Sequence, residues 1–355
     1  MSSFAVTAEK IEVIEHPNAD ALELAKVGGY HAVVAKGSYK SGDYAIYIPE
    51  AAVLPEELCE ELGLTGRLAG AAKNRVKAIR LRGELSQGIV CRPKALAGED
   101  LKEAQEQRRD FAAELGIKKW VADIPVHLAG DVVNGAELLS WIDIENIKRF
   151  PGVFVEGELV EATEKIHGSA CLVTFDQEAG LLVSSKGLGG KGLAIVESDS
   201  NTYWRAVTAH GLKEVARLVA KEYGASSVGL FGEVYGKGIQ DLGYNRERNQ
   251  EVGYGLFDVK IRVDQEVRWL SRDEIAKLSS VVTLVPVLYR GPFNAELLVK
   301  LAEGKESVSG TESHLREGLV VRSIPERYSD VVGGRAIAKV VSEAYLTRGG
   351  ATEYE

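Results

Sequence analysis

The sequence contains few cysteines and no long apolar run. Its three cysteines, Cys59, Cys91 and Cys171, are odd in number and far apart, so they supply neither a disulfide framework nor a zinc knuckle, and we expect a reducing compartment. No apolar stretch is long enough to cross a bilayer, and the first residues lack the apolar segment of a secretory signal. These absences predict a cytoplasmic protein without a membrane partner.

Positive charge is also scarce. The chain has 43 Lys and Arg residues against 52 Asp and Glu, and its net charge of -9 argues against a protein that coats nucleic acid by bulk charge. A local basic groove is compatible with this balance, because steering depends on how charge is distributed. No repeat or low-complexity segment occurs. The length of 355 residues, with an ordinary globular composition, predicts two domains.

The first part of the chain has the pattern of a small all-β domain. Short runs rich in β-forming residues are separated by turn residues, and one small helix is expected at 55–62. The predicted strands are 4–14, 31–36, 44–49, 75–82 and 87–92. This pattern suits a five-stranded OB-type barrel over residues 1–116, and a split sandwich fits nearly as well.

One stretch of this domain is basic. Residues 73–82 contain five basic side chains and no acidic one, so they are the candidate contacts to a nucleic-acid backbone. These side chains are Lys73, Arg75, Lys77, Arg80 and Arg82. The alternative is an edge strand protected by positive charge, and alternation does not decide between the two because the charges change parity midway.

The second part of the chain mixes strands and helices. We expect a helix at 99–115, a junction at 117–150, and a second domain at 151–355 with a long helix at 201–223. Its predicted strands are 153–160, 170–175, 181–185, 228–234, 254–261, 267–270, 318–321 and 336–341. Ser271 to Glu274 has capping-box spacing and should begin a short helix. Helices do not alternate regularly with strands, so the predicted class is α+β with largely antiparallel sheets.

A glycine-rich stretch at 187–192 has the spacing of a dinucleotide-binding fingerprint. Its context does not fit, because the following residues 193–196 have the composition of a strand and no helix begins there. We therefore interpret it as a flexible hairpin loop.

Five charged residues occur at strand positions where charge is costly unless it is paired, hydrated or bound to a ligand. They are Lys165, Lys186, Glu233, Glu317 and Lys339. Each alone has the alternative interpretation of an edge charge. Together, three lysines and two carboxylates are what nucleotidyl transfer needs, since a polyphosphate requires cations and a divalent metal requires oxygen ligands.

The ordered set of motifs around these residues resembles the covalent nucleotidyltransferases, which include ATP-dependent DNA ligases, RNA ligases and mRNA capping enzymes. The resemblance covers about residues 140–345. The matching motifs are Lys165 to Gly168 (motif I), Ser185 to Gly187 (Ia), Phe231 to Gly236 (III), Tyr254 to Val259 (IIIa), Glu317 to Val321 (IV) and the strand that holds Lys339 (V). The resemblance implies a nucleotidyltransferase domain with ATP-grasp-like antiparallel sheets behind the OB-type barrel.

Two features make the chain similar to the RNA ligase branch. His167 stands where DNA ligases and capping enzymes usually have Asp, and only 16 residues follow Lys339, which leaves no room for an OB domain after motif V. An OB-like module in front instead resembles RNA ligases with an N-terminal OB domain. Ala170 replaces an asparagine of some relatives, and the second lysine of motif V is missing, with Arg335 or Lys191 as candidates for that charge.

The resemblance implies a role for each motif residue. Lys165 would attack the α-phosphorus of ATP and form a lysine-adenylate, with Mg²⁺ or Mn²⁺ as the metal cofactor. Glu317 and Glu233 are the expected metal ligands, with Glu233 also placed at the ribose hydroxyls. The remaining members of the expected ATP site are Glu164, Gly168, Lys186, Phe257 and Lys339, with Phe257 stacked on adenine. For His167, contact with the leaving pyrophosphate and a structural hydrogen bond at the turn remain equal alternatives.

The expected substrate is a nicked duplex whose 3′-hydroxyl strand is RNA, on an RNA or DNA template, and we expect a monomer. A second hypothesis is an ATP-dependent DNA ligase, which His167 and the missing C-terminal domain disfavour. A third is a non-catalytic RNA-binding OB protein with a degenerate transferase domain, which predicts no transfer of AMP to Lys165.

Overall fold

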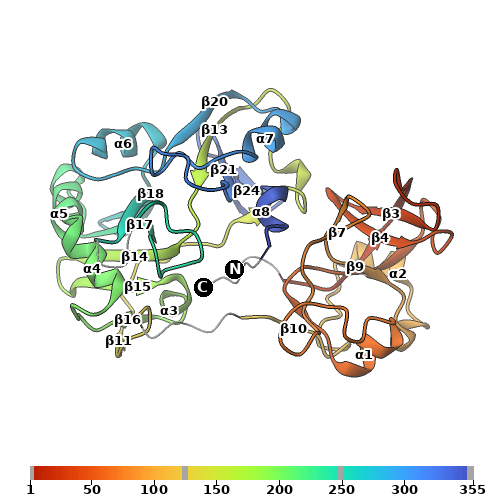
Figure 1. The fold of residues 1–355 in the computed structure, drawn as a ribbon. Coiled ribbons are helices and arrows are strands. Elements are labelled where there is room, and N and C mark those ends of the chain that lie inside the picture. The colour runs from red at the N-terminus through yellow and green to blue at the C-terminus, as the bar shows by residue number, and fades with distance from the viewer. Residues whose placement is uncertain (1–3, 122–126, 247–250, 350–355) are drawn as a thin grey trace. The chain divides into compact units, whose positions relative to one another are not determined.

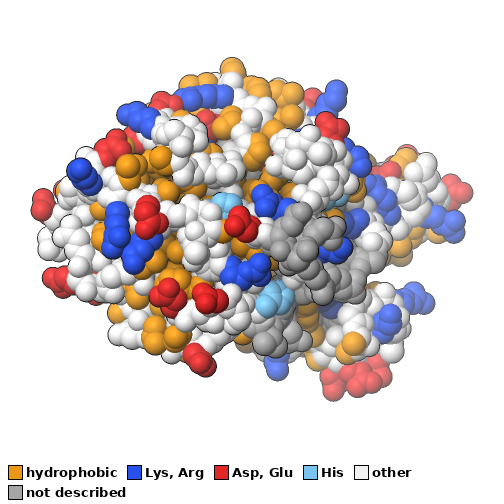
Figure 2. Space-filling view, turned by 60° about the vertical axis from the view of Figure 1, so that its left-hand side comes forward, with side chains coloured by type: hydrophobic (Ala, Val, Ile, Leu, Met, Phe, Trp, Pro, Cys, Tyr) orange, Lys and Arg blue, Asp and Glu red, His pale blue; other side chains and the backbone are white. Residues whose placement is uncertain are grey.

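The structure is a computed structural model that describes residues 4–121, 127–246 and 251–349 (Figure 1). Its contacts divide the chain into two compact units. The N-terminal unit comprises Met1–Ala122 and Glu145–Val153, and the C-terminal unit comprises Asp123–Ile144 and Phe154–Glu355. No helix among the described residues has both the length and the apolar character needed to cross a bilayer. On the face drawn in Figure 2, acidic and basic side chains are interspersed.

The segment predicted as a junction, 117–150, is shared between the units. Its strand β10 (Lys118–Lys119) pairs with β6 (Ala52–Val53) in the N-terminal unit. Leu128 and Leu139, in contrast, are buried in hydrophobic clusters of the C-terminal unit. Burial of these apolar side chains explains why part of the segment belongs to the C-terminal unit and the segment does not form a separate linker.

The N-terminal unit is mostly β. Two three-stranded antiparallel sheets have the orders β1-β5-β9 and β2-β3-β4. Their strands are β1 (Thr7–Lys10), β2 (Glu12–Glu15), β3 (Leu22–Val27), β4 (Tyr30–Ala35), β5 (Tyr44–Ile48) and β9 (Ile89–Cys91). The other elements are β7 (Ile79–Leu81), β8 (Glu84–Ser86), β12 (Glu145–Asn146), α1 (Glu56–Glu61), α2 (Leu101–Glu106) and 3-10 turns at Lys94–Leu96 and Pro151–Val153.

Strand β5 is apolar on both faces and supports two hydrophobic clusters. Ile46 and Ile48 pack into one cluster, whereas Ala45 and Tyr47 pack into the other. This alternation follows from the two-residue period of a strand. The central strand and the predicted helix at 55–62 are confirmed, whereas β3 was not predicted.

The predicted helix at 99–115 is wrong beyond its first two turns. Helix α2 ends at Glu106, and Arg108 adopts a φ of 51°. Phe111 is fully buried, and its backbone N–H donates to the Val6 carbonyl at 2.8 Å. Burial of this ring and pairing with the first strand therefore override the helical propensity of the sequence.

The C-terminal unit contains two antiparallel sheets. The first has the strand order β15-β14-β17-β18-β19, and the second contains β24-β21-β13-β20 in that order. The first sheet consists of β14 (Ser169–Asp176), β15 (Gly180–Ser185), β17 (Ser227–Tyr235), β18 (Gly253–Val263) and β19 (Glu266–Trp269). The strands named for the second are β13 (Leu159–Lys165), β20 (Val287–Pro292), β21 (Gly318–Ser323) and β24 (Ile337–Val341).

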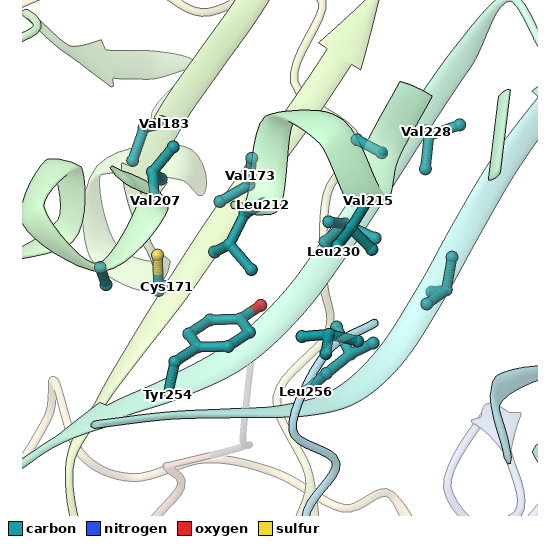
Figure 3. Close-up of a cluster of buried hydrophobic side chains, with 14 of the residues drawn as sticks. Cys171, Val173, Val183, Val207, Leu212, Val215, Val228, Leu230, Tyr254 and Leu256 are labelled. Atoms are coloured by element: carbon teal, nitrogen blue, oxygen red, sulfur yellow. The ribbon is translucent and has the colours of Figure 1, made fainter. Parts of the chain in front are cut away.

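Two helices cover one face of the first sheet (Figure 1). They are α4 (Thr202–Ala209) and α5 (Leu212–Tyr223). Figure 3 shows their apolar side chains, such as Val207 and Val215, directed at Val173, Leu230 and Leu256 of the strands. The opposite face of this sheet is thereby left to the functional residues.

The remaining elements of the C-terminal unit are short. They are α3 (Lys186–Gly189), α6 (Arg272–Ala276), α7 (Ala295–Ala302), α8 (Glu343–Leu346), the 3-10 turn Lys277–Ser280, and the strand pairs β11 (Val132–Asn134) with β16 (Leu193–Ile195) and β22 (Tyr328–Ser329) with β23 (Gly334–Arg335). The predicted capping box is confirmed, because the Ser271 hydroxyl accepts from the Glu274 N–H and the Glu274 carboxylate accepts from the Ser271 N–H.

Three further predictions are wrong. The helix expected at 201–223 is interrupted by Gly211, whose φ of 56° is left-handed. The strand expected at 153–160 is absent, because Gly157 turns the chain with a φ of 81° before β13 begins at Leu159. The glycine-rich stretch 187–192 is not a hairpin loop, since α3 occupies its start and β16 pairs with β11.

Candidate active site

Lys165 lies where the two sheets of the C-terminal unit meet. It is the last residue of β13 in the second sheet, and after a three-residue turn the chain enters β14 of the first sheet. The turn passes very close to β17, since a Cβ on Gly168 would lie 2.1 Å from the Val234 carbonyl oxygen. Gln240 holds the same turn by donating to the Gly168 carbonyl at 2.7 Å. Only glycine therefore fits the third position after Lys165.

Glu317 is the direct partner of Lys165. The Nζ atom of Lys165 donates to Oε1 of Glu317 at 2.6 Å, because Gly318 of β21 is the register partner of Lys165. Burial alone would raise the pKa of Glu317, but the ammonium of Lys165 and the ring of His167 hold it at about 2. Its second oxygen, Oε2, is buried without a hydrogen-bond partner among the described residues.

Two further lysines act on the same site. Lys339 of β24 is the register partner of Val320 on β21, and burial together with the charges of Lys165 and Lys186 lowers its pKa. Lys186 begins α3, and its Nζ lies 2.5 Å from Oδ1 of Asp143. The structure thus gathers three cations from both sheets, and Asp143 is a partner that the sequence did not reveal.

Glu233 is a half-buried carboxylate on β17, opposite Ala170 of β14. Burial raises its pKa to about 7, with the charge of Lys165 opposing this change and that of Glu317 adding to it. Glu233 and Glu317 are therefore electrostatically coupled to Lys165, yet only Glu317 is held firmly ionised.

Phe257 is the extra residue of a β-bulge. The register of β18 against β17 skips it, passing from Asp258 opposite Phe231 to Leu256 opposite Gly232. Its ring packs against Trp141 with centroids 5.1 Å apart. Bulges commonly redirect a side chain near functional sites, and here the bulge positions Phe257 on the sheet face that carries Glu233.

The carbonyl group of Phe257, released from regular pairing, accepts hydrogen bonds from two buried arginines. Arg272 Nη1 donates to it at 3.0 Å and Arg322 Nη2 at 3.2 Å. Arg272 also pairs with Glu161 of β13 at 2.6 Å. These contacts connect the first sheet to the second at the level of the site.

His167 is held at both ring nitrogens. Nε2 lies 2.5 Å from Oδ1 of Asp241, and Nδ1 lies 2.8 Å from the Tyr345 hydroxyl. Burial would lower the pKa of His167, but the nearby carboxylates of Asp241 and Glu317 raise it overall. Asp241 in turn accepts from both Arg348 Nε and Nη2 at 3.1 and 3.2 Å. Asp241, Tyr345 and Arg348 were not identified from the sequence, because they lie in segments without a recognisable motif.

Two of the predicted charged residues, Glu164 and Arg335, form their contacts with residues other than Lys165. The Glu164 carboxylate is buried and accepts from the Ser307 hydroxyl at 2.5 Å, with Arg316 Nε 3.5 Å away. Burial raises its pKa, although Ser307 opposes this shift. Arg335, a candidate for the missing motif V cation, is paired with Asp258 at 2.6 Å and Glu326 at 2.5 Å. Its charge is therefore already neutralised.

The basic run of the N-terminal unit is not one continuous strand. Arg75 forms isolated bridges, and its guanidinium lies 4.0 Å from the centre of the Trp120 ring. Pairing resumes only at β7, whose hairpin turn uses Arg82 with a φ of 51°. Lys73, Lys77, Arg80 and Arg82 are exposed, and Arg75 is half-buried. The interruption of regular strand between Arg75 and β7 explains why the basic residues occupy odd positions as far as Lys77 and even positions from Arg80 onward.

Comparison with known families and structures identifies both parts of the chain. Residues 158–341 match the RNA ligase family, and residues 5–93 match an OB-fold domain. No curated protein matches the chain in sequence. The fold is similar to that of Naegleria gruberi RNA ligase with PPi, with a TM-score of 0.77, 23% identity, and coverage of 97% of this chain and 98% of that one.

Two mutants of the same Naegleria gruberi enzyme give nearly the same match. One was solved with ATP and Mn and the other with AMP and Mn, and each has a TM-score of 0.78 at 22% identity over 97% of this chain and 98% of that one. The predicted fold is thus confirmed, with an OB-fold domain followed by an α+β nucleotidyltransferase-like domain built from antiparallel sheets. Since the matching family model spans more than half of its residues, the chain belongs to the RNA ligase family.

Proposed function

We propose that this RNA ligase uses ATP to seal nicks between a 3′-hydroxyl and a 5′-phosphate in a duplex, through an AMP group carried on Lys165. The observation that carries the proposal is the position of Lys165. Its amine lies 2.6 Å from Glu317 at the boundary of two sheets, beside the cations Lys186 and Lys339. A lysine with a purely structural role on the surface would not be expected in a cluster of three lysines and two carboxylates.

In the first step, the neutral amine of Lys165 attacks the α-phosphorus of ATP. A bond from Nζ to phosphorus forms, the bond to the bridging oxygen breaks, pyrophosphate leaves, and the nitrogen loses one proton to solvent. Lys186 and Lys339 are suited to neutralise phosphate oxygens as the leaving group departs. His167, held at both nitrogens, has a fixed orientation beside Glu317 from which it can contact the pyrophosphate.

The nucleoside part of ATP would lie against the first sheet. The ring of Phe257, directed by its bulge, offers a stacking surface for adenine, and Glu233 offers acceptors for the ribose hydroxyls. Structures of the similar Naegleria gruberi enzyme were solved with ATP or AMP, which supports an adenine nucleotide as the ligand. Gly168 lets the turn after Lys165 lie directly against β17 beside Glu233, because it has no Cβ to meet the Val234 carbonyl.

The site fits a hard divalent cation that keeps waters and phosphate oxygens as ligands. No group of three or more metal-binding side chains occurs in the part of the chain that the structure describes, which disfavours an all-protein metal cage. Oε2 of Glu317 is nevertheless buried and accepts no hydrogen bond from the described residues, and the charges of Glu317 and Glu233 influence each other. These carboxylates would hold Mg²⁺ or Mn²⁺ together with the triphosphate. Such an ion would neutralise negative charge as pyrophosphate forms.

Two transfers complete the reaction. The oxygen of the RNA 5′-phosphate attacks the phosphorus of the lysine-adenylate, the phosphorus to Nζ bond breaks, and AMP becomes linked to the 5′ end. The 3′-hydroxyl then attacks the 5′-phosphorus, AMP leaves, and the hydroxyl proton passes to solvent. Lys165 returns to its free form, so one ATP is used for each phosphodiester formed.

The substrate we propose is a nicked duplex with an RNA 3′-hydroxyl strand on an RNA or DNA template. The exposed side chains of Lys73, Lys77, Arg80 and Arg82, with Arg75, supply a local positive patch for its backbone in an otherwise acidic chain. We propose a monomer without a membrane partner. The free, buried state of Cys59, Cys91 and Cys171 is compatible with a cytoplasmic location.

Labelling and sealing experiments test this function together. Incubation with magnesium and ATP labelled at the α-phosphate should label the wild-type protein and leave Lys165→Ala unlabelled. Nicks that end in a ribose should be sealed faster than nicks that end in a deoxyribose. Equal sealing of both would favour a DNA ligase, and absence of label from the wild type would leave only an RNA-binding protein.

A further inference from the structure

A pocket opens beside the turn that carries Lys165. Its volume is about 320 Å³, and it is lined by Tyr235, Tyr244, Asn245, Arg246, Val308 and Ser309. The Tyr244 hydroxyl accepts a hydrogen bond from the His167 N–H at 2.6 Å. Tyr235 lies two residues after Glu233 on β17 and so shares its sheet face. The pocket is therefore adjacent to the turn that follows Lys165, yet none of its lining residues has a role in the chemistry derived above.

The pocket is lined by the aromatic rings of Tyr235 and Tyr244 and by the guanidinium of Arg246. The rings of Tyr235 and Tyr244 meet edge to face with centroids 5.0 Å apart. The guanidinium of Arg246 lies 5.5 Å from the centre of the Tyr235 ring. Aromatic rings can contact the exposed face of a base, such as the face that a nick leaves open, while an arginine contacts the phosphate.

A polyphosphate fits the pocket poorly. Arg246 is the one cation among the described residues that line it, whereas Lys186 and Lys339 both act at Lys165. Ser309, which lines the pocket, also donates its backbone N–H to the buried carboxylate of Glu306 at 2.8 Å. Burial would raise the pKa of Glu306, but its hydrogen bonds from Ser309 and Ser313 lower it, so the carboxylate stays negative. A second anionic group with several charges would be repelled here.

Asn245 supplies an acceptor at the edge of the pocket. Its side-chain Nδ2 donates to the hydroxyl of Thr311. Its Oδ1 receives no hydrogen bond from any residue within 4–121, 127–246 or 251–349, and the side chain is exposed. A ribose 2′-hydroxyl can donate to such an oxygen, whereas a deoxyribose cannot.

We propose that this pocket binds the terminal ribonucleotide of the strand that supplies the 3′-hydroxyl, and that Asn245 reads its 2′-hydroxyl. The proposal rests on the proposed ligase function and adds the residues that give it its RNA preference. The face of the terminal base that the nick exposes lies against Tyr235 and Tyr244, Arg246 contacts the phosphate of the terminal nucleotide, and Asn245 Oδ1 accepts from the ribose. This position brings the 3′-hydroxyl next to the site of the adenylylated 5′ end.

The test isolates the last chemical step in the full-length protein. A nicked RNA duplex is prepared with AMP already attached to its 5′-phosphate, so sealing needs no ATP. The terminal nucleotide on the 3′-hydroxyl side carries either ribose or 2′-deoxyribose. Sealing rates are measured for wild type, Asn245→Ala, Asn245→Asp and Arg246→Ala. Arg217→Ala is the matched control. Arg217 is an exposed arginine on α5, and its guanidinium lies over the ring of Phe175 of β14.

We expect Asn245→Ala to slow sealing of the ribose end about tenfold, the loss of roughly one hydrogen bond, and to leave the deoxyribose end unchanged. Asn245→Asp keeps an acceptor oxygen and should keep the preference for ribose. Arg246→Ala should raise the KM for both duplexes about tenfold with little change in kcat. All these variants should accept label from ATP within about twofold of wild type, and Arg217→Ala should match wild type throughout.

An unchanged ribose preference in Asn245→Ala would overturn the inference. Loss of ATP labelling in Arg246→Ala would also overturn it, because the pocket would then serve the triphosphate or pyrophosphate. A wild type that takes no label from ATP would instead refute the proposed function, so the two failures are distinguishable.

Discussion

At the scale of single residues, the site is defined by two carboxylates that face one lysine in different environments. Glu317 accepts directly from Lys165 and has a pKa of about 2, whereas burial raises the pKa of Glu233 to about 7. A firmly ionised carboxylate suits a cation, and one that titrates near neutrality suits hydrogen bonds with hydroxyl groups. This difference supports Glu317 as the main ligand of the metal and the ribose hydroxyls as the main partners of Glu233.

The low pKa of Asp241 predicts that stability falls in acid. Its value in the folded protein is about 2, because His167 and Arg348 outweigh the effect of burial, against 3.8 for the unfolded chain. The unfolded state therefore binds more protons as the pH falls, and stability that is complete above about pH 5 is lost progressively towards pH 2. We expect wild type to lose on the order of 2 kcal/mol more than Asp241→Asn over this range.

The check is urea unfolding of both proteins at several pH values between about 6 and 3. Parallel stability curves for wild type and Asp241→Asn would contradict the prediction. Asp273→Asn serves as the control, since Asp273 is largely exposed and should have little effect.

The charged residues of the site could be predicted, but their partners could not. Lys165, Glu233, Glu317 and Lys339 interrupt apolar strands, and such interruptions are visible in a sequence. Asp143 and Asp241 lie in irregular segments, where a carboxylate is unremarkable until the fold brings it to a lysine or a histidine. Arg335 shows the opposite error, because its sequence position suggested a free cation and its pairing with Asp258 neutralises it.

At the scale of elements, the bulge at Phe257 connects the fold to the site. A bulge leaves a carbonyl outside the regular ladder, and Arg272 and Arg322 satisfy it from outside the first sheet. The side chains of Arg272 and its partner Glu161 are each only 5% exposed. The position of the ring proposed to stack on adenine thus depends on a buried ion pair.

We predict that Arg272→Met lowers the free energy of unfolding by about 3–5 kcal/mol, because the buried Glu161 carboxylate loses its direct partner and keeps a contact of 3.8 Å with the exposed Arg290. The double variant Arg272→Met/Glu161→Leu should recover much of that loss. Both should raise the KM for ATP, since Phe257 loses a donor at its carbonyl. Urea unfolding and ATP labelling at several ATP concentrations measure the two effects.

Arg268→Met is the matched control for this cycle. Arg268 pairs with Glu274 on the surface, so its loss should change stability by less than about 1 kcal/mol. A double variant as unstable as Arg272→Met alone would refute the account of a buried, uncompensated charge.

The errors at element scale have tertiary causes. Helix α2 ends early because Phe111 is buried against the first strand, and nothing in the helical pattern of 99–115 signals that contact. The helix break at Gly211 has a local signal, a glycine that adopts a left-handed φ, but a glycine within a helical pattern is often tolerated. Strands β14 and β21 were predictable from their apolar runs, whereas β13, which contains Glu161 and Glu164, was expected too early in the chain.

At the scale of the whole molecule, the chain combines a catalytic unit with an OB-fold unit that carries a local basic patch. Motif order and hydrophobic pattern were sufficient to predict both units, since these depend on long stretches of sequence. The division of residues 117–150 between the units was not predictable, because it depends on which core receives Leu128 and Leu139.

The basic patch should determine how binding depends on salt. If exposed Lys73 and Arg82 each contact one phosphate, the variant Lys73→Ala/Arg82→Ala should bind nicked duplex with a slope of log affinity against log salt that is shallower by about 2 units. Fluorescence anisotropy at several salt concentrations measures this slope. The control Lys213→Ala/Lys221→Ala removes two exposed lysines of α5 and should leave it unchanged. An unchanged slope in the first variant would place the nucleic acid elsewhere.

The central claim is that the amine of Lys165 becomes covalently linked to AMP. The most direct test is peptide mass spectrometry of the full-length protein after incubation with ATP and magnesium. The account predicts an acid-labile AMP adduct on the peptide that contains Lys165, and none in Lys165→Arg, which keeps a cation beside Glu317 but no reactive amine. An adduct on Lys186 or Lys339 instead, or an unmodified wild type, would contradict it.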